Sequence, residues 1–385
     1  MHKKSFIDIP QSLKDKRVLL RVDFNEPLEK GKIEDSFRIK NTKPTIDLLV
    51  KRGARVILIT HLEDSKKKFI PFGMVVRQFE RALGKKLVLV KKYSKNAIDK
   101  AFWKGARMIL LENIRFQKGE EKNDPVFSRK LASFADIYIN EAFSVSHRAH
   151  ASVVGVPRFL PSYAGPLLRR EVERLSEALR PPHPFLLIVG GAKFDTKFAL
   201  LKNFIPTADA IFLGGILANT FLVTYSVDIG KSLIERDAVE DIRKHFLKSK
   251  KIVLPFDVRI KKGEAGVKSV FKLAPEDMIH DIGPETVQKL VGVARLARLV
   301  VWNGPLGYTD GGYVGGTREL LRGLARLKTK IIIGGGDTLA VLDEMRLHRK
   351  FYHVSTGGGA MLDFLADGSL PGIDSLLKAQ KRYKE

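Results

Sequence analysis

The chain has 385 residues, of which 44% are hydrophobic and 29% charged, and it carries a formal net charge of +25. Such a length exceeds one ordinary core and predicts two domains of α/β size. The sequence contains no cysteine, which excludes disulfides, thiolate catalysis and cysteine metal sites and fits a reducing cytoplasm.

The ends of the sequence and its hydropathy give no sign of membrane targeting. Residues 1–10 are charged and lack the apolar run of a secretory signal. No stretch of about 18 apolar residues occurs in the sequence, so we expect no membrane-spanning helix. We therefore expect a cytoplasmic protein that has no membrane partner.

The positive charge predicts attraction to an anionic partner, either nucleic acid or small phosphorylated metabolites. Charge alone does not choose between them, and a well-solvated surface of a lysine-rich chain is the simpler alternative. Because no recognisable nucleic-acid module accompanies the charge, we expect no obligate nucleic-acid partner. A nucleic-acid-binding protein is the rival interpretation from a different functional class.

Short apolar runs alternate with longer amphipathic stretches along the whole chain, which predicts an α/β fold of parallel sheets wrapped by helices. In the first half these runs cover residues 18–22, 56–60, 108–111 and 137–139. Ligands of open α/β sheets bind beyond the carboxyl ends of the strands. The residues that directly follow each run are therefore the candidates for chemistry.

Polar and charged side chains follow the runs of the first half. They include Asp23, Asn25, Arg38, His61, Arg115, His147, Arg148 and His150. Arginine forks match the oxygens of phosphate and carboxylate groups, so we expect a small and highly anionic substrate here. A structural hydrogen bond explains His61 equally well. A metal pair at His147 and His150 is a further alternative, but no third ligand stands at a recognisable spacing.

A connector is expected between the two halves. Hydrophobic residues recur there with helical spacing, at Leu168, Val172, Leu175 and Leu179. Three prolines then end that helix, at Pro181, Pro182 and Pro184. We therefore expect a first domain over residues 1–161, a connecting helix and hinge over 162–181, and a second domain over 182–369.

Glycine follows almost every apolar run of the second half. The runs cover residues 185–189, 210–213, 252–254, 299–302, 330–333 and 353–355, and all but the third lead into loops that contain Gly190, Gly214, Gly304, Gly335 and Gly358. Glycine lets the backbone approach a ligand and frees N–H groups at the next helix start, where phosphate binds. Turn geometry explains one such loop, but their repetition at one sheet edge favours a nucleotide site.

Three charged residues stand in these glycine loops. Asp337 follows three glycines and suits either Mg²⁺ on the phosphates or the cap of a helix. Lys193 and Lys197 stand at a helix start, where lysine is unfavourable unless an anion is present, so we expect both to contact phosphate. The P-loop and GxGxxG fingerprints are absent, which disfavours a dinucleotide oxidoreductase.

Several segments resemble the phosphoglycerate kinase family, in the family's order and over nearly the whole chain. They are Arg21-Val22-Asp23-Phe24-Asn25, Glu112-Asn113-Ile114-Arg115-Phe116, His147-Arg148-Ala149-His150-Ala151-Ser152, Gly190-Gly191-Ala192-Lys193, Trp302-Asn303-Gly304-Pro305, and residues 35–39, 44–46, 254–257, 281–284, 334–338 and 355–360. The resemblance implies reversible phosphoryl transfer between ATP and the carboxylate of 3-phosphoglycerate, a step of glycolysis and gluconeogenesis.

The resemblance also implies a fold and a set of partners. Two Rossmann-like domains with parallel sheets would face each other across a hinged cleft, the first binding 3-phosphoglycerate and the second the nucleotide. The segment of about residues 370–385 would return to the first domain. We expect ATP or ADP and 3-phosphoglycerate or 1,3-bisphosphoglycerate as partners of a monomer.

The resemblance assigns roles to individual residues. The acid substrate would be bound by Asp23, Asn25, Arg38, His61, Arg115 and Arg148. The nucleotide would be bound by Lys193, Lys197, Gly214, Gly215, Asn303, Gly304, Asp310, Gly336, Asp337 and Thr338, with Mg²⁺ at Asp337. Arg38, Lys193 and Gly358 would act in the transfer. The acceptor carboxylate is already ionised at neutral pH, so the requirement is charge neutralisation rather than a general base.

Two loops depart from the family pattern. The chain reads Thr60-His61-Leu62-Glu63-Asp64-Ser65 where the family usually reads Ser-His-Leu-Gly-Arg-Pro, so a substrate-binding arginine is missing. Lys66, Lys67 and Lys68 follow at once, and we hypothesise that they supply the charge. Asp310 stands where the family usually has a glutamate that contacts the ribose. A preference for a different acid substrate is the alternative that these changes raise.

Overall fold

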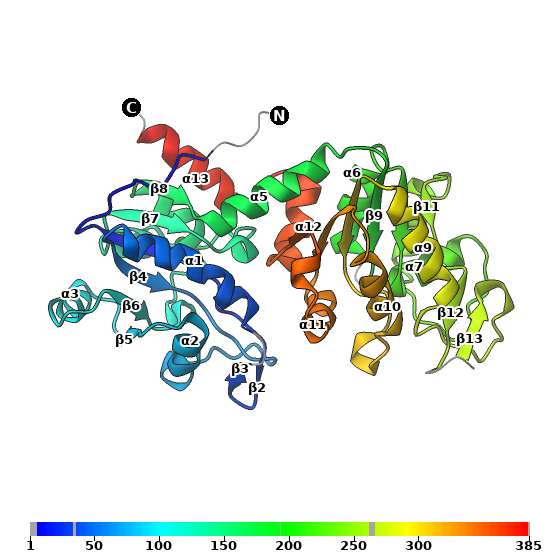
Figure 1. Ribbon diagram of the computed structural model, residues 1–385, viewed down its shortest axis with the longest axis horizontal. Helices are drawn as coiled ribbons and strands as arrows, with labels where there is room; N and C mark the ends of the chain where they lie inside the picture. The colour runs from blue at the N-terminus through cyan, green and yellow to red at the C-terminus, as the bar shows by residue number, and fades with distance from the viewer. Residues whose placement is uncertain (1–5, 34–35, 193, 262–265, 384–385) are drawn as a thin grey trace. The chain divides into compact units, whose positions relative to one another are not determined.

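The computed structural model describes residues 6–33, 36–192, 194–261 and 266–383. Two compact units make up the chain (Figure 1): residues up to Glu173 together with those from Ser369 onward, and residues Arg174 to Gly368. Each unit contains one parallel six-stranded sheet, so the expected α/β class with two parallel sheets is confirmed. None of the helices within the described ranges has the length and apolar character needed to cross a bilayer.

The sheet of the first unit has the strand order β5-β6-β4-β1-β7-β8, and all neighbouring strands are parallel. Its strands are β1 (Arg17–Arg21), β4 (Arg55–Ile59), β5 (Val88–Val90), β6 (Met108–Leu111), β7 (Ile137–Asn140) and β8 (Ser162–Ala164). The central strands are buried on both faces, which explains why they are continuous apolar runs in the sequence. A short antiparallel hairpin, β2 (Leu28–Glu29) and β3 (Lys32–Ile33), follows β1.

The helices of the first unit are α1 (Phe37–Lys51), α2 (Val76–Leu83), α3 (Lys95–Trp103), α4 (Pro125–Ala132) and α13 (Pro371–Arg382). Helices α1 and α2 cover one face of the sheet, since Ile46 and Phe79 share a core cluster with Leu20 and Leu58. Helix α13, red in Figure 1, returns to this unit: its Gly372 N–H donates to the Ser146 carbonyl at 2.8 Å. The C-terminal segment therefore packs on the first unit.

The connecting helix α5 (Pro166–Leu179) is shorter than the expected 162–181 segment. Residues 162–164 instead form the edge strand β8, which pairs with β7. Proline favours the first position of a helix, so Pro166 marks where the helix can begin. The division between the units falls inside α5, between Glu173 and Arg174, and so within the expected connecting segment 162–181.

The sheet of the second unit has the order β11-β10-β9-β15-β16-β17, again all parallel. Its strands are β9 (Phe185–Val189), β10 (Ala210–Leu213), β11 (Ile252–Val253), β15 (Leu299–Asn303), β16 (Lys330–Gly334) and β17 (His353–Val354). A separate antiparallel sheet, not expected from the sequence, contains β12 (Asp257–Arg259), β13 (Val267–Ser269) and β14 (Asp281–Ile282).

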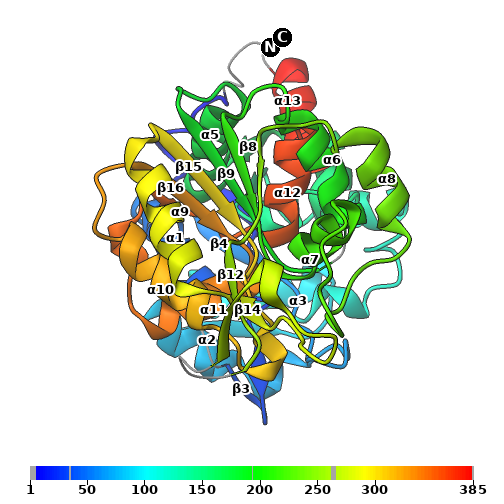
Figure 2. The same cartoon turned by 90° about the vertical axis from the view of Figure 1, so that its right-hand side faces the viewer.

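Helices cover both faces of the second sheet. They are α6 (Asp195–Phe204), α7 (Gly215–Thr224), α8 (Ala238–His245), α9 (Pro284–Leu296), α10 (Gly315–Leu324), α11 (Gly336–Glu344) and α12 (Gly358–Asp367). Figure 2 shows α9 and α10 on one side of β9 and β15, and α6 and α7 on the other. The fully buried Trp302 lies in the core that α9, α10 and α11 share with the strands. The glycine loops thus connect the carboxyl ends of buried strands to helix starts.

Candidate active site

In the first unit, the polar residues that follow β1 and β4 lie together. Arg38, in the first turn of α1, donates from Nη1 to the Asn25 carbonyl at 2.6 Å and to Asp23 Oδ2 at 3.3 Å. The carboxylate of Glu26 accepts the backbone N–H of Arg38 at 2.6 Å and so caps the start of α1. This cap fixes the position from which the Arg38 side chain extends.

Asp23 is held as a carboxylate. Burial raises its pKa, but Arg38, a hydrogen bond from Ser144 and Arg21 outweigh that effect and bring the pKa down to about 2. A permanently ionised Asp23 is a fixed partner for the guanidinium of Arg38.

His61 is buried, with 1% of its surface exposed. Its Nδ1 lies 3.7 Å from Asp23 Oδ1 and 3.5 Å from Nη2 of Arg21. Burial holds the pKa of His61 well below its usual range; Asp23 opposes this shift, and Arg21, Arg115 and Arg148 add to it. The ring is therefore neutral and acts as a hydrogen-bonding group beneath the cations.

Two further segments, one with Arg115 and one with His150, complete this region. Arg115, at the turn η2 (Ile114–Phe116), donates from Nη1 to Glu121 at 2.8 Å and lies 3.2 Å from His150 Nδ1. Burial, Arg115 and Arg148 lower the pKa of His150 to about 3. His150 thus contacts an arginine, and no set of three or more His, Asp or Glu side chains within the described ranges is grouped to hold a metal ion.

We call this set of residues the basic cluster. It comprises Arg21, Asp23, Asn25, Arg38, His61, Arg115, Arg148 and His150, and so contains all the residues that the sequence predicted for the acid substrate. Exposure divides it: Asn25, Arg38 and Arg148 are partly open to solvent, whereas Asp23, His61 and Arg115 are buried. Cations at an open surface over buried supports can bind phosphate and carboxylate oxygens.

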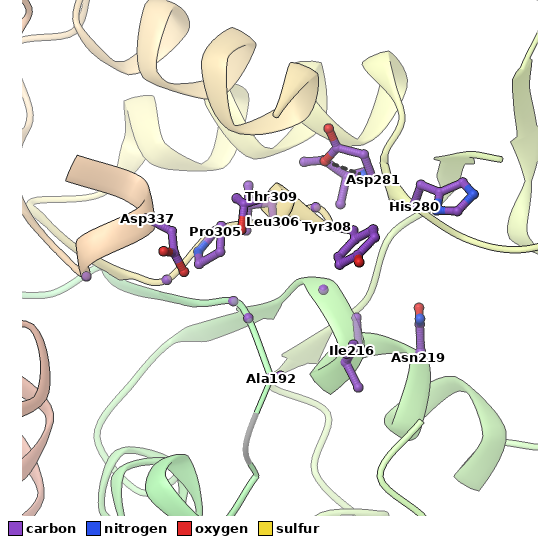
Figure 3. A pocket seen from close by; sticks show the side chains of 18 of the residues that line it. Ala192, Ile216, Asn219, His280, Asp281, Pro305, Leu306, Tyr308, Thr309 and Asp337 are labelled. Carbon is purple, nitrogen blue, oxygen red and sulfur yellow. Dashed lines mark hydrogen bonds between the residues drawn. The ribbon is translucent and has the colours of Figure 1, made fainter. Parts of the chain in front are cut away.

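The second unit contains a pocket of about 600 Å³ where its glycine loops meet. Loops from five strands contribute to the lining: Gly190, Gly191, Gly215, Gly304, Gly307, Gly335, Gly336, Gly358 and Gly359. We call it the glycine pocket. Figure 3 shows Asp337 at one end and Asn219 and His280 at the other, with Pro305, Leu306 and Tyr308 between.

Close approach of the loops requires glycine at two positions of this pocket. Gly215 has φ +64, and a Cβ there would meet the Gly191 nitrogen at 2.9 Å. Gly335 has φ +100, and a Cβ there would meet the Gly304 nitrogen at 2.8 Å. Neither position can therefore hold a residue with a side chain unless the backbone shifts.

Three helices begin at the glycine pocket without a side-chain cap. The N-cap residues of α7, α11 and α12 are Gly214, Gly335 and Gly357, and none of the three helices has a side-chain cap hydrogen bond within the described residues. Uncapped N–H groups and the helix dipole together attract anions. Asp337 lies in the first turn of α11 and is not its cap.

Lys197, Asp310 and Asp337 are three of the charged side chains that line the glycine pocket, and Asp281 is another. Lys197 is buried in the first turn of α6 and donates to the Ala192 carbonyl. Burial raises the pKa of Asp337 and the nearby Asp310 raises it further, while Lys197 lowers it. The pocket therefore brings two carboxylates and an ammonium group close to the uncapped helix starts.

Apolar side chains also line the pocket, namely Ile216, Leu233, Met278, Leu306 and Tyr308. A flat ring fits such a wall, and the uncapped helix starts suit phosphate groups. The shape and chemistry thus suit a nucleotide.

The structure places most of the predicted nucleotide residues in this pocket. Those that line it are Lys197, Gly215, Asn303, Gly304, Asp310, Gly336 and Asp337, together with Gly358. Gly214 and Thr338 are buried and are not among the residues that line it. The Thr338 hydroxyl has no hydrogen-bond partner within the part of the chain that the structure describes. Lys193 lies outside the described residues.

Sequence reasoning did not assign several residues of these two regions. Arg21 belongs to the basic cluster, and the apolar wall of the pocket contains Leu233 and Met278. Arg21 is the last residue of a buried strand, and an arginine inside an apolar run was the available signal. Leu233 and Met278 lie in irregular segments with no periodicity to reveal them.

Comparison with known proteins gives a consistent result. The model of the family "Phosphoglycerate kinase" matches residues 8–368. The phosphoglycerate kinase of Moorella thermoacetica is 42% identical over 94% of this chain and 97% of its own. That of Pelotomaculum thermopropionicum is 41% identical over 98% of this chain and 100% of its own.

Solved structures agree with these relatives. The phosphoglycerate kinase of Pyrococcus horikoshii has a TM-score of 0.86 at 28% identity, covering 96% of this chain and 98% of its own. That of Coxiella burnetii has a TM-score of 0.80 at 35% identity, covering 95% and 97%. Sequence, fold and pocket chemistry agree over the full length of the match, and the chain belongs to the phosphoglycerate kinase family.

Proposed function

We propose that the chain transfers a phosphoryl group reversibly between ATP and the carboxylate of 3-phosphoglycerate, a reaction of glycolysis and gluconeogenesis. The observation that carries this proposal is the family match over residues 8–368, which spans both the basic cluster and the glycine pocket. The first unit then acts as the 3-phosphoglycerate-binding domain and the second as the nucleotide-binding domain. Family membership also supports a monomer that acts in the cytoplasm.

The basic cluster is proposed to hold the acid substrate. Asn25, Arg38 and Arg148 reach solvent and contact the phosphate and carboxylate oxygens. Arginine is suited to this task because its fork of N–H donors matches two oxygens at once. Beneath them, the ionised Asp23 orients Arg38, the neutral His61 lies next to Asp23, and Arg115 adds positive potential.

The glycine pocket is proposed to hold ATP or ADP. The base lies against Ile216, Leu306 and Tyr308, and the phosphates lie at the starts of α7, α11 and α12. Lys197, Asn303, Gly304 and Asp310 line the space between. We propose that Gly214 and Thr338 do not contact the nucleotide and instead hold the backbone of their neighbours Gly215 and Asp337 in place.

The residues present fit a magnesium ion that accompanies the nucleotide. Asp337 and Asp310 are close enough that the charge of Asp310 raises the pKa of Asp337. A divalent cation relieves such repulsion, and carboxylate oxygens are the ligands that Mg²⁺ prefers. We propose that Asp337 holds Mg²⁺, whose charge would neutralise the phosphate oxygens during transfer.

The mechanism follows from charge rather than from proton transfer. An ionised carboxylate attacks a triphosphate, so the chain must align two anions and offset their repulsion. We propose that Arg38 does so on the acid side, and that Lys193 and the N–H groups of residues 357–359 do so on the nucleotide side. The segment 162–181, which contains α5, is proposed as the hinge that lets the two bound substrates meet.

A coupled assay with ATP, Mg²⁺ and 3-phosphoglycerate tests the proposal. We expect ADP formation that depends on 3-phosphoglycerate, and loss of about 10²–10³ in kcat for Lys193→Ala. ADP formation only with a different carboxylic acid would move the chain to another substrate. No turnover, together with tight nucleic-acid binding at physiological salt, would favour the nucleic-acid alternative.

A further inference from the structure

A buried carboxylate lies below the basic cluster and is not part of the mechanism above. Glu120 has no exposed surface. Its Oε1 accepts a hydrogen bond from the Ser152 hydroxyl at 2.5 Å, and its Oε2 accepts the Ser152 backbone N–H at 2.9 Å. Its carbonyl oxygen accepts the backbone N–H of Ala151 at 2.8 Å. One residue thus receives three hydrogen bonds from a single turn.

That turn is the start of η4 (Ala151–Gly155), directly after His150. Glu120 itself lies in the segment that follows Arg115. The three hydrogen bonds therefore join the segment that carries Arg115 to the segment that carries Arg148 and His150. The separation of these side chains depends on that junction.

The contact between Glu120 and Ser152 also reaches Arg21 and His61 of the basic cluster. The Ser152 hydroxyl accepts a hydrogen bond from Nε of Arg21 at 2.9 Å, and Nη2 of Arg21 lies 3.5 Å from His61 Nδ1. Arg21 has no exposed surface, so its charge needs a buried partner. Tyr138 donates to the Ser152 carbonyl at 2.6 Å and fixes the turn from the sheet side.

We propose that Glu120, acting through Ser152, is a positioning residue for the acid substrate. It holds the arginine-bearing segments at the separation that the substrate requires, and it balances the buried charge of Arg21. Glu120 does not touch the substrate, since the cluster covers it. This inference rests on the proposed binding of 3-phosphoglycerate at the basic cluster.

Glu120→Gln is the variant that tests the proposal. An amide has one acceptor oxygen, so it cannot accept both Ser152 hydrogen bonds in the present arrangement. We expect the KM for 3-phosphoglycerate to rise between about 10-fold and 100-fold, the range that a displaced binding group produces. The KM for ATP stays within about twofold, because the glycine pocket lies in the other unit. Calorimetry should show the same weakening of 3-phosphoglycerate binding.

Two further variants separate positioning from folding. Ser152→Ala removes the hydroxyl between Arg21 and Glu120 with little change of volume, so it tests the contact if Glu120→Gln fails to fold. Asp257→Asn is the matched control: Asp257 is also buried and accepts the Thr286 hydroxyl at 2.6 Å and its N–H at 2.7 Å, but it lies in the second unit. It should lower the thermal midpoint without changing the KM for 3-phosphoglycerate.

The outcomes are distinct. An unchanged KM and Kd for 3-phosphoglycerate in folded Glu120→Gln and Ser152→Ala would overturn the positioning role and leave a structural one. The positioning role would also be overturned if Glu120→Gln raised the KM for ATP and the KM for 3-phosphoglycerate, each by the same factor as Asp257→Asn. Failure of the unmodified chain to bind 3-phosphoglycerate would instead contradict the proposed function.

Discussion

The guanidinium of Arg38 lies 3.3 Å from the carboxylate of Asp23, and the two groups come from different elements of the first unit. Asp23 follows β1, whereas Arg38 lies in the first turn of α1. The pair converts a flexible arginine into a fixed one, which lowers the entropy lost when a substrate binds. The proposed site for the acid substrate therefore depends on a carboxylate that the substrate itself would repel.

Asp23→Asn should weaken both the site and the fold. We expect the KM for 3-phosphoglycerate to rise about 10-fold, because Arg38 loses its charged partner. The pKa of Asp23 is lowered from 3.8 to about 2 in the folded chain. Its stabilisation is therefore complete above about pH 4 and lost as the pH falls toward 2, and it amounts to about 2 kcal/mol.

Urea denaturation of the wild type and Asp23→Asn between about pH 5 and pH 2 measures the stabilisation that ionised Asp23 contributes. The difference in unfolding free energy between them should narrow as the pH falls. A constant difference across that range would show that Asp23 is not held ionised by its neighbours.

The lysines after His61 should act as a substitute for the missing arginine. The carboxylate of Asp64 accepts the N–H groups of Lys66 at 2.9 Å and Lys68 at 2.8 Å, which closes a tight turn. The loop is joined to the basic cluster, because Asn25 Oδ1 accepts the Glu63 N–H at 2.9 Å. All three lysines are exposed on this turn.

Replacing Lys66, Lys67 and Lys68 by alanine should raise the KM for 3-phosphoglycerate by roughly threefold to tenfold, the size expected for exposed charges. Alanine at the exposed Lys91, Lys92 and Lys95 removes the same charge from another segment and serves as the control. We expect the effect to weaken at high salt. If the two triple variants had the same KM for 3-phosphoglycerate, the lysines after His61 would not replace the missing arginine.

Gly335→Ala should damage the nucleotide site selectively. With φ +100 and the Gly304 nitrogen 2.8 Å from the position of a Cβ, alanine displaces the start of α11. We expect a higher KM for ATP, an unchanged KM for 3-phosphoglycerate and a loss of about 1–2 kcal/mol in stability.

The control for Gly335→Ala is Gly292→Ala, within α9. A Cβ at Gly292 meets nothing within 4 Å, so alanine there should stabilise the helix by up to about 1 kcal/mol. If both alanine variants bound ATP as tightly as the wild type, the glycine pocket would not be the nucleotide site.

The buried Glu141 should make the stability of the first unit depend on pH. It accepts the Leu167 N–H at 3.1 Å at the start of α5 and is bonded by the Thr45 hydroxyl. Burial raises its pKa from 4.5 to about 8 despite these hydrogen bonds. The protonated Glu141 side chain therefore stabilises the fold fully below about pH 4.5, and this stabilisation is lost as the pH rises through about 8.

Glu141→Gln cannot ionise, so its unfolding free energy should vary less than that of the wild type between about pH 5 and pH 8. Chemical denaturation at several pH values provides the comparison. Parallel pH profiles for the two proteins would contradict a raised pKa at Glu141.

Much of the fold was predictable because buried parallel strands are continuous apolar runs. Strands β6, β9 and β10 have the bounds that the sequence predicts. The short edge strands β5 and β8 were missed, since three residues give no periodicity. The antiparallel sheet of β12, β13 and β14 was missed because its strands are short and partly polar.

The candidate site was less completely predictable. Residues that follow strands of the same sheet, such as Asp23 and His61, are predicted to meet because parallel strands share one carboxyl edge. The sequence does not show which of them are buried, so His61 and Thr338 could not be recognised as buried groups. The roles of these residues in binding stay predictions.

Part of the positive charge that makes up the net charge of +25 stands near helix ends. The helix dipole favours cations there. Lys85 and Lys86 follow α2, Arg298 follows α9, and Lys328 follows α10. The charge therefore does not by itself require a nucleic-acid partner.

Calorimetric titration of Arg38→Ala and Asp337→Ala with each substrate separately is the most direct measurement of the central claim. Arg38→Ala should lose affinity for 3-phosphoglycerate and keep its affinity for MgADP, and Asp337→Ala should show the reverse. Loss of both affinities in either variant, or of neither, would contradict the division of the two substrates between the units.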